Sequence, residues 1–235
     1  MKIRIILCFT LFLGLLSAQT AVPHKEIVVL LHGLGRGKSI MDKMEIRMSA
    51  AGFVPAAIGY ESIGRTPQEI LADVSAQLNT ITADTSTRIH FVGHSLGGLL
   101  IRAYLDSNRI PNLGKVVLIG SPNKGTPLVD YFREAWVLKL AGPIAAALGT
   151  DKNNFPHSLH PPYYPVGIIA GTAGWFNNEG IIPGDDDGIV PVESTKIEGM
   201  TDFILLPVSH SSLPKNEAVA LQTIEFLRNG RFKKD

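Results

Sequence analysis

Short apolar runs alternate along the chain with longer stretches in which apolar positions recur at helical spacing. The first run, Glu26 to Leu31 (EIVVLL), predicts a buried strand. Strands are predicted at 26–31, 53–58, 88–92, 115–119, 166–170 and 202–207. Helices are predicted at 39–51, 66–81, 96–107 and 215–228. This alternation favours an α/β fold with a mostly parallel six-stranded sheet and helices on both faces.

One long stretch, residues 122–165, does not follow this rhythm. It contains an apolar, helix-like portion at 131–148 and then a looser stretch rich in Pro, His and Tyr at 155–165. Long insertions in compact domains are usually functional and often act as lids. We therefore predict a helical cap over the substrate. The alternative is an extra pair of helices packed on the core.

The beginning of the chain differs from the rest. Lys2 and Arg4 precede a nearly continuous apolar run at 5–16, and small residues follow at 17–18. This pattern is typical of a secretory signal peptide, and the run is shorter than the roughly 20 residues that span a bilayer. We predict a signal peptide at 1–18, a catalytic domain at 19–235 and a secreted or periplasmic protein. An uncleaved anchor is the alternative.

Composition and charge narrow the class of protein. Hydrophobic residues make up 45% and charged residues 18%, which is typical of a globular chain. The formal net charge is +1, and no basic stripe indicates nucleic acid as a partner. The single cysteine, Cys8, lies in the predicted leader, so the remaining domain has no internal disulfide.

The strongest chemical signal is the G-x-S-x-G motif at Gly93-His94-Ser95-Leu96-Gly97, between a predicted strand and a predicted helix. A serine hydroxyl needs a neighbouring base, and a sharp strand–turn–helix elbow presents it to one. The amide of Leu96, at the helix N-terminus, is placed to bind a tetrahedral oxyanion. The alternative is a glycine-rich turn without chemistry.

A second motif, His32-Gly33-Leu34-Gly35, ends the first predicted strand. Ligands of parallel α/β sheets bind at the carboxyl ends of the strands. The amide of Leu34 is therefore the expected second oxyanion donor, and His32 is expected to be structural.

The general base and its orienting acid should follow the serine in that chain order, acid before histidine. His210 follows the last predicted strand, and the adjacent Asp185, Asp186 and Asp187 follow the fifth. Asp187 is favoured because it directly precedes Gly188-Ile189-Val190, with the other two as alternatives. A weak calcium site is another interpretation of the trio, although the spacing matches no calcium loop. The remaining domain has no cysteine and no H-x-x-x-H pair on a predicted helix, so no metal or other cofactor is expected.

Together these segments resemble the lipases and esterases of the α/β-hydrolase superfamily, a group that includes inositol-deacylase-like esterases. HGLG, GHSLGG, DDDGIVPVES and SH occur in that group's order between about residues 26 and 229, and 121–127 (SPNKGTP) is similar to a segment of many bacterial lipases. The resemblance implies the α/β-hydrolase fold, Ser95 as nucleophile, Asp187 as acid and His210 as base. It also implies an oxyanion hole made by the amides of Leu34 and Leu96.

These features predict a serine hydrolase that cleaves carboxylic esters of lipid-like or other hydrophobic acyl groups through an acyl-enzyme. The cap contributes an apolar set in which Trp136 and Leu140 are the predicted substrate-binding residues. A thioesterase, an amidase and an acyltransferase share the same triad and remain alternatives. A non-catalytic lipid-binding protein is a further one. The expected partner is a small-molecule or lipid ester, with transient membrane-surface contact left open.

Overall fold

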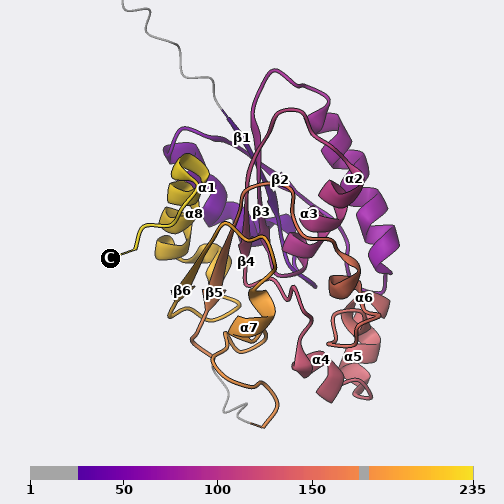
Figure 1. Cartoon of the computed structure of the whole chain (residues 1–235). Helices are drawn as coiled ribbons and strands as arrows, with labels where there is room; N and C mark the ends of the chain where they lie inside the picture. Colours follow the sequence, from indigo (N-terminus) through magenta and orange to yellow (C-terminus); the bar gives the residue numbers. More distant parts are fainter. Residues whose placement is uncertain (1–25, 175–179, 235) are drawn as a thin grey trace, which may run out of the picture.

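The computed structural model describes residues 26–174 and 180–234, so the predicted signal peptide lies outside the described residues. A six-stranded sheet of order β2-β1-β3-β4-β5-β6 runs through the middle of the molecule, and every neighbouring pair is parallel (Figure 1). The strands are β1 (Ile27–Leu31), β2 (Val54–Ile58), β3 (Ile89–His94), β4 (Leu113–Ile119), β5 (Val166–Gly171) and β6 (Asp202–Leu206). The predicted α/β-hydrolase fold is confirmed.

Helices cover both faces of the sheet, as predicted (Figure 1). One face carries α1 (Asp42–Ala50), preceded by the 3-10 turn η1 (Lys38–Met41), and α8 (Glu217–Asn229). The other face carries α2 (Pro67–Thr82) and α3 (Leu96–Ser107). The short helix α7 (Val192–Thr195) precedes β6, and the 3-10 turn η3 (Leu213–Lys215) follows it.

Strand β1 shows why its sequence is apolar throughout. Successive side chains of a strand point to opposite faces. Val28 and Leu30 lie in the cluster beneath α1 and α8, whereas Val29 and Leu31 lie in the cluster beneath α2 and α3. All four are fully buried, because both faces of a parallel sheet are covered.

The start of α2 follows its sequence signal closely. Thr66 Oγ accepts from the Glu69 amide at 3.3 Å, and the Glu69 carboxylate accepts from the Thr66 amide at 2.8 Å. This capping box, with Pro67 in the first turn, satisfies amides that a helix start leaves unpaired.

The insertion at 122–165 is helical but divided. It holds α4 (Pro127–Tyr131), α5 (Trp136–Ala141), α6 (Pro143–Ala146) and the 3-10 turn η2 (Phe155–Ser158). Gly142, at φ +84°, and Pro143 end α5 and begin a new turn, so the apolar portion at 131–148 is not one helix. In Figure 1, α4, α5 and α6 lie together at one end of the molecule, with α6 next to the start of α2, and the Ile144 amide donates to the Arg65 carbonyl at 2.9 Å.

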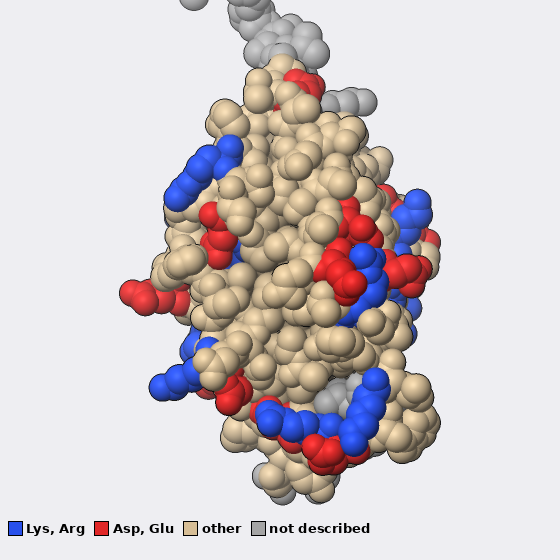
Figure 2. Space-filling view, turned by 90° about the vertical axis from the view of Figure 1, so that its right-hand side faces the viewer, with Lys and Arg blue, Asp and Glu red and all other residues tan. Residues whose placement is uncertain are grey.

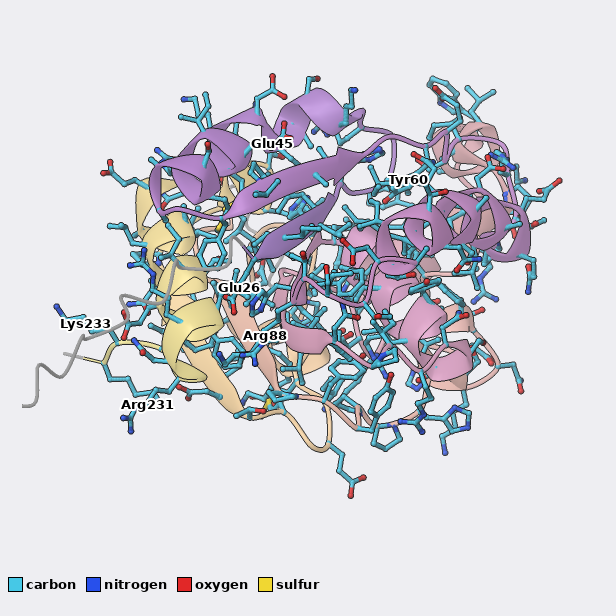
Figure 3. The ribbon with its side chains drawn as sticks, turned by 90° about the horizontal axis from the view of Figure 1, so that it is seen from above. Glu26, Glu45, Tyr60, Arg88, Arg231 and Lys233 are labelled. Carbon is cyan, nitrogen blue, oxygen red and sulfur yellow. The ribbon has the colours of Figure 1, made fainter. Side chains whose placement is uncertain are left out.

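Polar side chains interact at the amino ends of β1 and β3. Glu26 accepts from His90 Nε2 at 3.1 Å and lies 3.7 Å from Arg88, and Figure 3 shows Glu26 and Arg88 close together. His90, on β3, is fully buried. Among the described helices, none is long and apolar enough to cross a bilayer.

Candidate active site

Ser95 occupies a strained turn between β3 and α3. Its φ of +55° is the one positive value at a non-glycine residue within 26–174 and 180–234. A Cβ at Gly93 would lie 2.5 Å from the Gly98 backbone, and one at Gly97 would lie 2.4 Å from the carbonyl oxygen of Leu31. The glycines of the motif therefore let helix and strand approach closely enough to form the sharp turn.

Three predicted residues meet at the carboxyl ends of β3, β5 and β6. His210 Nε2 lies 3.1 Å from Ser95 Oγ, and His210 Nδ1 lies 2.7 Å from Asp187 Oδ2. A carboxylate only accepts, so Nδ1–H donates to Asp187 and Nε2 is left to accept from the serine hydroxyl. The structure thus brings Ser95, His210 and Asp187 into one hydrogen-bonded chain.

The surroundings of Asp187 separate it from its two acidic neighbours. Its side chain is 1% exposed, and Oδ1 accepts from the amides of Ile189 at 3.0 Å and Val190 at 2.8 Å. Asp186 instead accepts from the Gly188 amide, and the side chain of Asp185 is exposed. Of the three, Asp187 alone reaches His210.

His94 takes part in the site in a way that the sequence did not reveal. Its ring lies 4.8 Å from the ring of His210, and its Nε2–H donates to the carbonyl of His210 at 3.1 Å. Burial, together with the nearby His210 and Arg36, lowers the pKa of His94 well below its usual range. A neutral His94 therefore positions the base without placing a second positive charge beside it.

The loop that carries Leu34 is fixed from the side of β2. The ring of His32 stacks on Tyr60 with centroids 4.0 Å apart, and the Tyr60 hydroxyl donates to the His32 carbonyl. The Gly35 amide donates to Ser62 Oγ at 2.9 Å. His32 is structural, as expected, whereas Tyr60 and Ser62 belong to no recognised motif and were not predicted.

The two predicted oxyanion donors, Leu34 and Leu96, come from two different segments near Ser95. Leu34 lines the cavity that contains Ser95, and Leu96 is the first residue of α3. Neither amide donates to another residue of the described part of the chain. Both amides therefore remain available as the predicted oxyanion donors.

The cavity at Ser95 has a volume of about 230 Å³. Its walls are mainly apolar. They come from the loop that carries Leu34, from the cap at 122–165 and from the loop that carries Asp187. Trp136 and Leu140 do not line it, and their side chains are 73% and 66% exposed on α5. The cavity is lined by Gly33, Leu34, Arg36, Ile40, His94, Ser95, Pro122, Thr126, Val129, Leu148, Ile189, Val190, His210 and Ser211.

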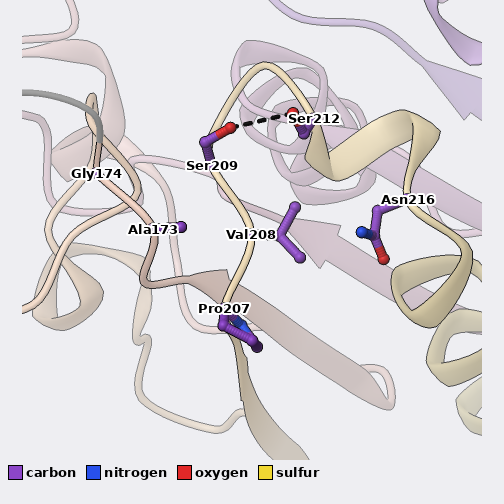
Figure 4. Close-up of a pocket in the computed structure, with 7 residues that line it drawn as sticks. All are labelled: Ala173, Gly174, Pro207, Val208, Ser209, Ser212 and Asn216. Carbon is purple, nitrogen blue, oxygen red and sulfur yellow. Dashed lines mark hydrogen bonds between the residues drawn. The ribbon is translucent and has the colours of Figure 1, made fainter.

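A second hollow, of about 470 Å³, is lined in part by Pro207, Val208 and Ser209, directly before His210 (Figure 4). Seven described residues line it, and its hydroxyls at Ser209 and Ser212 bond to each other at 3.1 Å. None of those seven is an acid or a base. The hollow therefore offers none of the chemistry found around Ser95.

Charge is spread in small groups over the surface. On the face shown in Figure 2, blue and red side chains lie next to each other, with wide uncharged areas between them. Within the described ranges, no cluster of three or more His, Asp or Glu side chains is suited to holding a metal ion.

The sheet order, the strained serine turn and the strand-end loops define the α/β-hydrolase fold. The chain belongs to the palmitoyl protein thioesterase family, whose model matches residues 27–157. This match includes Ser95 and the loop that carries Leu34, and it ends before Asp187 and His210. A search of curated proteins found no match.

Solved structures of lipases and esterases share the fold. The mature lipase BlEst2 from Bacillus licheniformis is 18% identical, with a TM-score of 0.71 over 88% of this chain and 93% of that chain. A monoglyceride lipase from Saccharomyces cerevisiae is 15% identical, with a TM-score of 0.61 over 90% and 88%. The metagenomic carboxyl esterase MGS0156 is 17% identical, with a TM-score of 0.61 over 81% and 66%. At these identities the likeness concerns the fold.

Proposed function

We propose that the protein is a serine hydrolase that cleaves carboxylic esters of hydrophobic acyl groups. The observation that carries the proposal is the hydrogen-bonded chain from Ser95 through His210 to Asp187, set beside an apolar cavity. The fold shared with lipases and esterases supports an ester hydrolase in general.

In the first half of the reaction, Ser95 Oγ attacks the ester carbonyl while His210 Nε2 takes its proton. The amides of Leu34 and Leu96 bind the oxygen that becomes negative. The C–O bond of the ester then breaks, His210 donates its proton to the leaving alcohol, and the acyl group remains on Ser95. Asp187 holds the imidazole orientation and stabilises the imidazolium.

In the second half, a water molecule replaces the alcohol. His210 takes its proton, the resulting tetrahedral intermediate collapses, and the carboxylic acid leaves as the proton returns to Ser95. Because the same amides bind both intermediates, the site needs no rearrangement between the two steps.

A thioester is the second candidate substrate, because the matching family is described as a thioesterase family. The same steps apply with a thiol as the leaving group. Comparing kcat/KM for an oxygen ester and a thioester of the same acyl group separates the two candidates, and a large excess for the thioester would favour it.

The proposal is tested with p-nitrophenyl butyrate, the wild-type protein and Ser95→Ala. We expect the variant to lose activity by about 10⁴- to 10⁶-fold. Ser209→Ala is the matched control, because its hydroxyl bonds to Ser212 and not to the base. It should stay within a few-fold of wild type. Activity that survives in Ser95→Ala would contradict the proposal.

A further inference from the structure

We propose that Tyr60 and Ser62, in the segment after β2, are positioning residues of the oxyanion hole, because their hydroxyls hold the loop that carries the Leu34 amide. The inference rests on the proposed function, since it takes that amide as one of the two oxyanion donors. It assigns a role in turnover to two residues that do not line the cavity beside Ser95.

The loop that carries Leu34 lies against the serine turn. A Cβ at Gly33 would lie 3.0 Å from the Cβ of Ser95. The Arg36 amide donates to the Gly33 carbonyl at 3.3 Å, and Gly35 has a φ of +64°, so the chain turns tightly at Leu34 and Gly35. A small rotation of this turn would change the direction of the Leu34 amide relative to Ser95.

The two hydroxyls hold this turn on both sides of Leu34. Before Leu34, the Tyr60 hydroxyl donates to the His32 carbonyl. After Leu34, the Gly35 amide donates to Ser62 Oγ at 2.9 Å. This carbonyl and this amide belong to the peptide bonds directly before and directly after the one that contains the Leu34 amide. The direction of the Leu34 amide is therefore fixed from both sides.

The ring of Tyr60 also acts on the peptide that contains the Leu34 amide. It stacks on the ring of His32 with centroids 4.0 Å apart, and His32 Nδ1–H donates to the Gly33 carbonyl at 2.9 Å. In a planar trans peptide the N–H points away from the C=O. By keeping the His32 ring in place, Tyr60 thus helps to set where the Leu34 N–H points.

The segment that carries the two hydroxyls is itself well anchored. Tyr60 and Ser62 are 8% and 2% exposed, and Tyr60 belongs to the cluster beneath α2 and α3. Gln77, on α2, donates from Nε2 to the Gly59 carbonyl at 3.0 Å. Burial raises the pKa of Tyr60, so its hydroxyl keeps the proton that it donates. The two hydroxyls therefore connect a packed helix to the loop beside Ser95.

The first test measures turnover of p-nitrophenyl butyrate by Tyr60→Phe and Ser62→Ala. Each variant loses one hydroxyl, and phenylalanine keeps a ring that can stack on His32. We expect kcat to fall about tenfold in each, less than the roughly 10²- to 10³-fold cost of removing an oxyanion donor, because the Leu34 amide is displaced and not lost. KM should stay within about twofold of wild type, because the oxyanion forms only after the ester has bound.

The second test uses butaneboronic acid, an analogue that forms a tetrahedral anion with a serine hydroxyl. Its Ki should rise about tenfold in both variants, in parallel with the fall in kcat, because it needs the same donor as the transition state.

Tyr104→Phe is the matched control. Tyr104 is 1% exposed on α3, and its hydroxyl donates to Asn79 Oδ1 at 2.8 Å. The control therefore loses a buried tyrosine hydroxyl, as Tyr60→Phe does, but one that does not hold the Leu34 loop. It should leave kcat and Ki at the wild-type values.

Three results would overturn the positioning role. The first is wild-type kcat and Ki in both Tyr60→Phe and Ser62→Ala. The second is a raised KM without a fall in kcat. The third is an equal loss of activity in Tyr104→Phe, which would mean that any lost buried hydroxyl has the same effect.

Failure of the proposed function gives a different result. If the wild-type protein hydrolyses no ester, or if Ser95→Ala is as active as wild type, the hydrolase proposal itself fails. If Ser95→Ala is inactive and both hydroxyl variants behave as wild type, the hydrolase proposal stands and the positioning role alone is refuted.

Discussion

Two parts of the cavity are built in different ways: its floor, formed by Ser95, His94, Asp187 and His210, and the cap at 122–165. Ser95 and His94 are 7% and 4% exposed and lie at the carboxyl end of β3, and Asp187, which is 1% exposed, lies in the loop that follows β5. The cap consists of helices of four to six residues, and its Tyr131 and Trp136 are 65% and 73% exposed. The serine and its neighbouring histidine thus stand at the end of a buried strand, whereas the cap is an insertion whose exposed positions can vary without disturbing them.

The largest effect should come from the floor, at Asp187. Asp187→Asn keeps the shape of the side chain, but its amide can no longer accept as a carboxylate does, so the wrong imidazole tautomer is favoured. We expect kcat to fall by about 10⁴-fold. The measurement is ester hydrolysis at saturating substrate.

Asp185→Asn is the control for this change, because its exposed side chain does not contact His210. It should remain within about twofold of wild type. A larger loss in Asp185→Asn than in Asp187→Asn would mean that the acid has been assigned to the wrong member of the trio.

The next largest effect should be on stability, at the hydrogen bonds that connect α3 to the cap. Arg102, on α3 and 3% exposed, donates to Asn123 Oδ1 at 2.9 Å and to the carbonyls of Leu159 at 3.1 Å and His160 at 3.2 Å. Burial lowers the pKa of Arg102. Arg102→Met removes three hydrogen bonds and leaves the buried Asn123 Oδ1 without its donor. It should lower the free energy of unfolding by about 2–4 kcal/mol, measured in urea.

Arg109→Met provides the comparison for this joint. Arg109 is exposed and lies 3.5 Å from the ring centre of Tyr163, a contact whose loss should cost about 0.5–1 kcal/mol. Equal destabilisation by the two substitutions would show that the Arg102 bonds do not anchor the cap.

A smaller effect should appear in the pH dependence of stability. Burial lowers the pKa of His94 and of His32 from the usual value of 6.5. Below about pH 6.5 the unfolded chain then binds more protons than the folded one, so stability falls as pH falls. Each such histidine contributes a slope of about 1.4 kcal/mol per pH unit.

His94→Gln keeps a donor for the His210 carbonyl and removes the titrating group. Its urea unfolding, measured between pH 5 and pH 7 (roughly the window over which a histidine of usual pKa titrates), should show a shallower slope than wild type. An unchanged slope would mean that His94 is protonated in the folded protein.

The smallest effect is expected on the outer surface of the cap. Trp136→Ala and Leu140→Ala should change the free energy of unfolding by less than about 0.5 kcal/mol, because both side chains are exposed. Their kcat/KM for a soluble butyrate ester should change less than about twofold. A tenfold loss of kcat/KM would mean that Trp136 and Leu140 contact the substrate after all. Reduced flotation with lipid vesicles would instead assign them to a membrane surface.

The sequence predicted the floor far better than the cap. Ser95, Asp187 and His210 each follow a strand, so the strand pattern placed them at one edge of the sheet. Trp136 and Leu140 were chosen from an apolar stretch in which Ile144 of α6 is buried in the core, whereas the α5 side chains of Trp136 and Leu140 are exposed. Val129 and Leu148, which line the cavity, have no local signal that distinguishes them from those two.

Two other features were not predicted, for different reasons. The Gly142-Pro143 pair is a visible break signal, yet the apolar pattern around it continued through the turn. Tyr60 and His94 act by holding the backbone of His32 and His210, which lie 28 and 116 positions away from them. Such partners can be found only once the chain has been folded.

The position of His210 also determines when the site comes into being. The base follows β6, which pairs with β5 at the edge of the sheet, and its amide donates to the Asp187 carbonyl at 2.8 Å. A nascent chain released up to β5 already holds Ser95 and the Leu34 loop but has no base beside them. During synthesis, therefore, the serine turn should form first, and catalytic competence should arise only as the final strand and helix dock.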